Sequence, residues 1–169
     1  MNRLGSFLAV AALLFLGTAR AQTPPQWSVY QPAGGGFSVE LPVDPDFKSE
    51  QISTDSGPAR QTSAQILTGG LDCMVRFVEY QIEADARTRF ERTRANFASN
   101  ATIRQNTALT IGDVPASRIV FDLADGDTAT SLLVATDKNR IVQIVCVVPK
   151  NQEGAAAMAR IYRSLTLVK

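Results

Sequence analysis

Residues 139–149 read NRIVQIVCVVP, the most apolar strand-like stretch of the chain. Valine and isoleucine, which favour strands, fill most of it, and Pro149 ends it because proline cannot donate a hydrogen bond to a neighbouring strand. A strand with so few polar positions is typical of the middle of a sheet. We therefore expect residues 140–148 to form a central strand.

Shorter strand-like segments flank this stretch. Apolar and polar residues alternate in GFSVELP (36–42), as in a half-buried strand. Turn sequences separate several of the other segments: DSGP at 55–58, GG at 69–70, GDVP at 112–115 and DGD at 125–127. Strands joined by such short turns pair antiparallel. The expected strands comprise residues 37–41, 47–54, 60–68, 71–80, 103–111, 116–123, 128–136 and 140–148.

Two segments have the 3.6-residue period of a helix. The first runs from about Glu83 to Ser99, where Glu83 and Asp85 suit the positive N-terminal end. The second follows Asn151, a good N-cap residue. The sequence thus predicts an α+β sandwich, a mostly antiparallel sheet of about six to eight strands flanked by two helices. The apolar helix faces carry Ala86, Phe90, Thr93 and Phe97 in the first segment and Ala155, Met158, Ile161, Tyr162 and Leu165 in the second.

The N-terminus has the three parts of a secretory signal peptide. Arg3 supplies the positive charge, FLAVAALLFL (7–16) the apolar run and ARA (19–21) the cleavage site. The apolar run is too short to cross a bilayer, so no membrane span is expected. The alanine-rich signal indicates a bacterial protein, periplasmic or secreted after cleavage near Ala21. The chain then divides into a signal peptide (1–21), an extended leader rich in Gln, Pro and Gly (22–36) and a single α+β domain (37–169).

The exported chain is close to neutral. Removing residues 1–21 takes two of the 17 Lys and Arg residues and none of the 16 Asp and Glu residues, which leaves 15 basic against 16 acidic side chains. Nucleic-acid binding usually shows as a domain-wide basic balance, and membrane-surface binding as a polybasic tract. Both partners are therefore disfavoured by the composition.

Two cysteines, Cys73 and Cys146, lie in strand-like segments with apolar residues two positions away on either side. Both thiols are expected to point into the core. In an exported protein a disulfide between them is expected. The alternative is two separate buried cysteines that pack as small apolar residues.

Most catalytic and metal chemistry is disfavoured, and no catalytic residue, metal or cofactor is predicted. The chain has no histidine, which removes Ser-His and Cys-His catalysis and the commonest zinc ligand. The glycines of residues 34–36 precede a strand, whereas phosphate-binding loops follow one. Asp122, Asp125 and Asp127 depart from calcium-loop spacing and favour a hairpin turn.

Two groups of side chains are candidates for partner contact. The first predicted helix carries Arg87, Arg89, Arg92 and Arg94, and arginine binds carboxylates and phosphates in a bidentate manner. The alternative is a solvated helix face whose charge is partly offset by acidic neighbours. Trp27 and Tyr30 are the second group, and they would either meet a partner or fasten the leader to the sheet edge.

The order of elements resembles the PsbP-like family. The stretches that carry the resemblance are GFSVELP (36–42), IGDVPASRIVFDL (111–123), NRIVQIVCVVP (139–149) and IYRSLTL (161–167). The resemblance implies an antiparallel sheet flanked by helices, and binding or assembly work more than catalysis. The matched residues are turn and core positions, so no functional residue carries over.

The sequence therefore predicts a non-enzymatic binding or assembly module that uses one sheet face or the arginine-bearing helix to meet a protein or an anionic component of the envelope. Two rival functions remain: a small enzyme that works without histidine, which would need a deep pocket with convergent carboxylates or a reactive cysteine, and a purely structural envelope protein. The partner, the oligomeric state and the strand order are not predicted.

Overall fold

The computed structural model describes residues 26–42, 45–68, 70–99, 102–123, 126–136, 139–149 and 154–168, with the side chains of residues 86 and 97–99 left out. The predicted signal peptide, the proposed cap Asn151 and the turn residue Asp125 lie outside the described residues.

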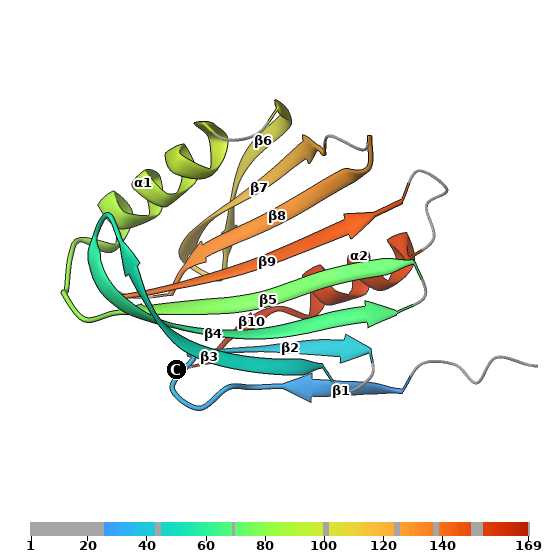
Figure 1. The fold of residues 1–169 in the computed structure, drawn as a ribbon, viewed down its shortest axis with the longest axis horizontal. Coiled ribbons are helices and arrows are strands. Elements are labelled where there is room, and N and C mark those ends of the chain that lie inside the picture. Colours follow the sequence, from blue (N-terminus) through green and yellow to red (C-terminus); the bar gives the residue numbers. More distant parts are fainter. Residues whose placement is uncertain are drawn as a thin grey trace, which may run out of the picture.

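Seven antiparallel strands form the main sheet (Figure 1). Strand β9 is fourth of the seven, so the NRIVQIVCVVP stretch is central as its sequence predicts. Four consecutive residues of β9 are buried, Val142 and Ile144 on one face of the sheet and Ile141 and Gln143 on the other. The strands, in spatial order, are β3 (Asp46–Thr54), β4 (Gly57–Thr68), β5 (Leu71–Tyr80), β9 (Arg140–Val148), β8 (Thr128–Ala135), β7 (Val114–Asp122) and β6 (Thr102–Ile111).

A second, three-stranded sheet has the order β1 (Trp27–Tyr30), β2 (Phe37–Pro42) and β10 (Thr166–Leu167). It raises the number of strands among the described residues above the expected six to eight. Strands β1 and β10 are four and two residues long, too short to show a period, and both exist through antiparallel pairing with β2. Part of the expected extended leader is therefore strand β1.

The hairpins are tighter than the sequence indicated. Strand β4 begins at Gly57 and β7 at Val114, so Pro58 and Pro115 lie in strands rather than in turns. Each connection is a two-residue turn, and Gly57 and Gly112 have positive φ angles of 99° and 59°. Such angles are accessible to glycine at little cost, which lets the chain reverse over so few residues.

Helix α1 (Ala86–Ser99) begins three residues later than the expected Glu83. The cause is Asp85, whose carboxylate accepts hydrogen bonds from the Thr88 backbone N–H at 2.8 Å and the Thr88 hydroxyl at 2.9 Å. This is an N-cap, and it satisfies backbone donors that the first turn leaves free. The same hydrogen bonds lower the pKa of Asp85.

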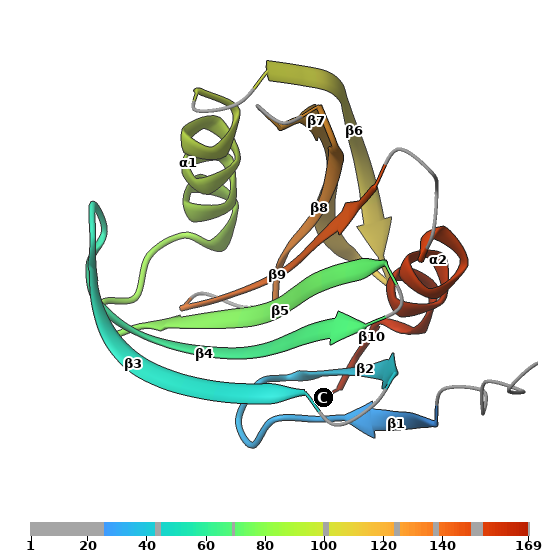
Figure 2. The ribbon, with the colours of Figure 1, turned by 45° about the vertical axis from the view of Figure 1, so that its right-hand side comes forward.

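Helix α2 (Ala155–Ser164) lies on the opposite face of the main sheet from α1 (Figures 1 and 2). It packs against β2, β5 and β9, whereas α1 packs against β8. Ile161 of α2 is fully buried, and the Tyr162 hydroxyl donates to the Thr130 carbonyl oxygen at 2.5 Å. Leu165, expected on the helix, is buried but extended, and the chain continues from it into β10.

The main core lies between the large sheet, α2 and the small sheet. Strand β5 gives Leu71, Cys73, Val75 and Phe77 to it, because alternate residues of a strand face the same side. The other side of β5 gives Val78 and Tyr80 to a smaller cluster around Phe90 of α1, with Ala59, Leu133, Ala135 and Ile141. The fold is the predicted α+β arrangement of antiparallel sheets and two helices.

Candidate binding face

One face of the large sheet is covered by α1 at one end only. Figure 2 shows the sheet curving around this side, with α1 on the inside of the curve. Arg76 of β5 stands opposite Gln143 of β9 in the register, so both side chains lie on this face. We call it the open face.

A row of hydrogen-bonded polar side chains crosses the open face from β3 to β8. Arg76 is its centre: its Nε donates to Gln143 Oε1 at 2.8 Å, its Nη2 donates to the same oxygen, and its Nη1 donates to Gln61 Oε1 at 3.3 Å. The amide nitrogens of both glutamines are turned away from Arg76. Gln61 Nε2 donates to Glu50 Oε1 at 3.3 Å, and Gln143 Nε2 donates to the Ser131 hydroxyl at 2.8 Å. These outer contacts hold both glutamine oxygens toward the guanidinium.

The Arg76 guanidinium has no carboxylate partner among the described residues; its three hydrogen bonds end on neutral amide oxygens. Burial lowers its pKa, while the charge of Tyr80 acts in the opposite direction. A largely desolvated cation is costly unless it is paired. Arginine has five N–H donors, so two remain for a ligand.

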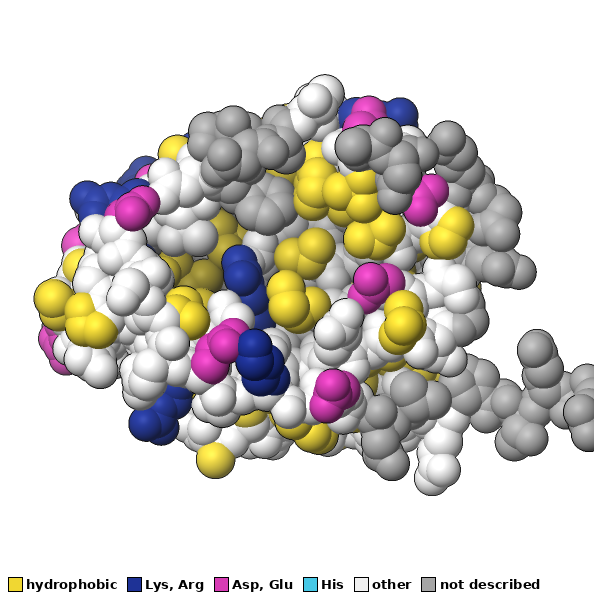
Figure 3. Space-filling model, viewed as in Figure 1, with side chains coloured by type: hydrophobic (Ala, Val, Ile, Leu, Met, Phe, Trp, Pro, Cys, Tyr) yellow, Lys and Arg dark blue, Asp and Glu magenta, His cyan; other side chains and the backbone are white. Residues whose placement is uncertain are grey.

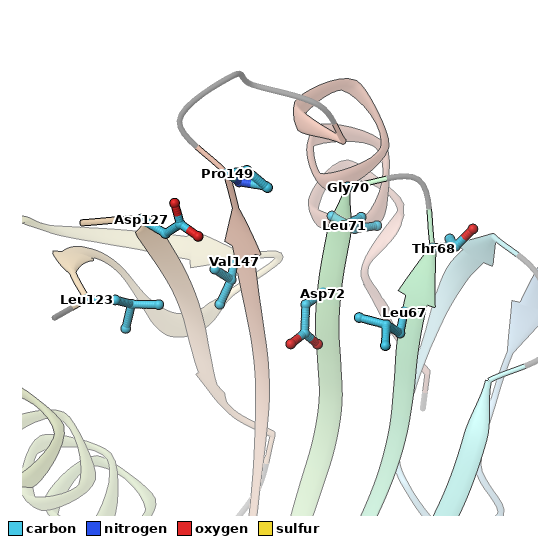
Figure 4. Close-up of a pocket in the computed structure, with 9 residues that line it drawn as sticks. All are labelled: Leu67, Thr68, Gly70, Leu71, Asp72, Leu123, Asp127, Val147 and Pro149. Atoms are coloured by element: carbon cyan, nitrogen blue, oxygen red, sulfur yellow. The ribbon is translucent and has the colours of Figure 1, made fainter. Parts of the chain in front are cut away.

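A cavity of about 470 Å³, lined by apolar side chains and by the carboxylates Asp72 and Asp127, lies at the end of the sheet away from α1 (Figure 4). Leu67 of β4, 78% exposed, lines it together with Asp72, Val147 and Leu123. Figure 3 shows apolar side chains gathered over this part of the open face, with charged side chains beside them. The volume is within the range of small-ligand sites.

The four arginines of α1 do not share one surface. Arg87 and Arg92 are exposed, and the Arg92 guanidinium lies 3.5 Å from the Ser56 hydroxyl. Arg94 forms an ion pair with Glu91 at 2.8 Å, one helical turn away. Arg89 points the other way and is 3% exposed.

The buried Arg89 is a structural contact between α1 and the sheet. Its guanidinium lies 3.8 Å from the centre of the Tyr80 ring, and its Nη2 donates to the Ile82 carbonyl oxygen at 2.6 Å. Its Nε and Nη1 have no hydrogen-bond partner in the described part of the chain. The prediction that Arg89 is a partner-contact residue like Arg87, Arg92 and Arg94 is therefore wrong, because its position on the helix turns its side chain toward the sheet.

Trp27 and Tyr30 fasten β1 to the body of the protein. The Arg160 guanidinium of α2 lies 4.1 Å from the centre of the Trp27 ring. The Tyr30 ring packs edge-on against Phe37 and at a tilt against Phe47, with centroids 6.2 and 5.3 Å apart, and burial raises the pKa of its hydroxyl. Both rings are half-buried, which matches attachment of the leader to the sheet.

Cys73 and Cys146 stand directly opposite each other on β5 and β9, with Cα atoms 4.1 Å apart, and form a disulfide. Both are fully buried in the main core, on the face opposite the open face. The bond therefore joins the two central strands on the side of the sheet away from the open face. Among the described residues, no group of three or more acidic or cysteine side chains is placed to hold a metal ion.

Sequence reasoning did not single out Arg76, Gln143 or Gln61. A signal was present, because Arg76 and Gln143 are polar residues that interrupt apolar runs in the middle of two strands, LDCMVRFVEY and RIVQIVCVV. Recognising that Arg76 lies opposite Gln143 requires the register of β5 and β9, which local sequence patterns do not reveal.

No family model and no curated protein sequence matches the chain. Among solved structures, it is similar to the solution structure of cyanobacterial PsbP (CyanoP) from Synechocystis sp. PCC 6803, with a TM-score of 0.54 and 11% sequence identity over 90% of this chain and 98% of that protein. The chain has a PsbP-like fold. The likeness concerns the fold alone, so the open face is interpreted from this chain's own residues. None of the described helices has the length and apolar character needed to cross a membrane.

Proposed function

We propose that this protein is an exported, non-enzymatic binding or assembly module that meets its partner, a protein or an anionic component of the bacterial envelope, on the open face. A PsbP-like fold fits such a module. Cleavage near Ala21 would release it into the periplasm or the medium.

One observation carries the proposal: Arg76 is fixed on the open face by two oriented amides, yet has no carboxylate partner among the described residues. Arg89 also has no carboxylate partner among the described residues, but it is buried and stacks on the Tyr80 ring, whereas Arg76 is partly exposed, so a ligand would be able to supply the negative charge that pairs it. The position of Arg76 on the same face of the sheet as the cavity suits recognition of an anionic group.

The exposed arginines of α1 would extend the same surface. Arg87 and Arg92 lie on the helix that borders the open face, where they would attract an acidic partner from a distance. Such exposed charges affect the rate of association more than the affinity. Arg76 is therefore expected to decide whether a partner stays bound.

The test is a pull-down from bacterial envelope extract with the tagged exported chain, analysed by mass spectrometry. Arg76→Gln is compared with wild type and with Arg60→Gln, whose exposed arginine lies on the opposite face of the sheet. A third variant changes Arg87, Arg92 and Arg94 to Ser. We expect Arg60→Gln to retain the wild-type partner and Arg76→Gln to lose at least nine-tenths of it.

The helix variant is expected to bind more slowly and to lose part of the partner at raised salt. Identical partners in equal amounts from all four proteins would refute the proposal. Melting temperatures of the four proteins show whether each is folded.

A further inference from the structure

We propose that the open face binds a short, extended peptide with free termini, whose C-terminal carboxylate pairs with Arg76 and whose N-terminal ammonium pairs with Asp72. This inference rests on the proposed function and gives the chemical class of the ligand.

The carboxylate end is set by the donors that Arg76 has left. Three of its five N–H groups are used by Gln143 and Gln61, and two remain. Two N–H groups of one planar guanidinium match the two oxygens of a carboxylate. The amides already hold the guanidinium in place, so binding would order little that is not ordered beforehand.

The middle of the site is apolar. Met74 of β5 stands opposite Val145 of β9, and both are partly exposed on the open face. The next pair on this face is Asp72 and Val147, both of which line the cavity. A ligand that leaves Arg76 along the strands therefore crosses apolar side chains before it reaches the cavity.

The far end is acidic. Asp72 is exposed and lines the cavity beside Leu67 and Val147 (Figure 4), and within the described part of the chain its carboxylate has no hydrogen bond or ion pair. A fatty acid that binds Arg76 would place its apolar tail against this carboxylate, at a cost. An ammonium group there would gain an ion pair instead. Figure 3 shows basic and acidic side chains on this face with apolar side chains between them.

The distance between the two charges sets the length of the ligand. Arg76 and Asp72 are four residues apart on one strand, about 13 Å at ~3.3 Å per residue. An extended peptide has the same rise, so about four residues span the two sites. Longer peptides would have to bend away from the face, and dipeptides would reach one end only.

The experiment is isothermal titration of the exported full chain with two apolar tetrapeptides, ALVL and AFVA. Each is used with free termini, with a C-terminal amide, and with an N-terminal acetyl group, and decanoate is the lipid probe. The proteins are wild type, Arg76→Gln, Asp72→Asn and the control Arg60→Gln, with each fold checked by its melting temperature.

We expect amidation to weaken binding to wild type and Arg60→Gln at least tenfold, about 1.4 kcal/mol, and to have less than a twofold effect on Arg76→Gln. Acetylation should likewise weaken binding to wild type and Arg60→Gln at least tenfold and have less than a twofold effect on Asp72→Asn. The inference is overturned if free and blocked peptides bind equally, if neither peptide binds at millimolar concentration, or if decanoate binds and the peptides do not. The pull-down keeps the two proposals apart: if its partner depends on Arg76 while no peptide binds, the binding function stands and the peptide ligand falls.

Discussion

The Cys73–Cys146 disulfide gives the prediction with the largest expected magnitude. The two cysteines are 73 residues apart in sequence, so the bond closes a long loop in the unfolded chain. Loop closure of this length removes about 15 cal/mol/K of entropy from the unfolded state, about 4 kcal/mol at 25 °C. In the folded protein the paired strands already hold the two Cα atoms 4.1 Å apart, so reduction should leave the sheet in place.

Reduction should therefore lower stability without changing the fold. With a urea slope of about 2 kcal/mol/M, the unfolding midpoint of the reduced protein should fall by about 2 M. The assay is urea unfolding, followed by circular dichroism, of the oxidised protein, the reduced protein and the double variant Cys73→Ala, Cys146→Ala. The double variant should be slightly less stable than the reduced protein, since it also loses buried sulfur. Midpoints of oxidised and reduced protein within 0.5 M of each other would refute the loop-closure reasoning.

Two further predictions concern the ends of the helices. Gly154→Ala should destabilise the protein by about 2 kcal/mol or more, because φ is 82° and an added Cβ would lie 2.9 Å from a backbone oxygen and 3.0 Å from the Leu71 Cβ. The control Gly112→Ala, with φ 59° and open space around the added Cβ, should cost only the conformational strain of about 1 kcal/mol. Equal losses of stability for the two variants in chemical denaturation would contradict this account. Asp85→Asn should lower the melting temperature at neutral pH, and the difference from wild type should shrink as the pH falls. The Thr88 hydrogen bonds lower the pKa of Asp85 in the folded state, so the stability that its carboxylate contributes is present above the unfolded pKa of about 4 and disappears as the pH falls through the lower folded value. A melting-temperature difference between variant and wild type that stays constant from pH 7 to pH 2 would show that the carboxylate charge is not involved.

Much of the fold follows from local sequence patterns. The apolar stretch at 139–149 identified the central strand, because burial on both faces leaves few polar positions. Strand β5, at Leu71–Tyr80, has the predicted bounds. The weakest predictions were at element ends: α1 begins at Ala86 rather than at about Glu83, because the Asp85 carboxylate accepts the Thr88 N–H and caps the helix there.

The candidate site followed from the sequence much less. Arginine density on one helix was the visible feature, yet Arg89 is buried against Tyr80 and Arg94 is paired with Glu91. The side chain with unused donors on the open face is Arg76, which lies in the mostly apolar middle of β5. Charge density along a helix does not report which side chain lacks a partner.

The sequence by itself determined the antiparallel α+β composition, the central strand and the inward direction of both cysteines, because these depend on periods of two and 3.6 residues that local sequence displays. Only the tertiary structure decided that Cys73 faces Cys146, that Arg76 faces Gln143, and that β1 and β10 exist. All three depend on strand order and register, which are set by contacts between residues far apart in the chain. Pairing across β5 and β9 places the disulfide on one face of the sheet and Arg76 on the other, so the same two strands form part of the core and of the open face.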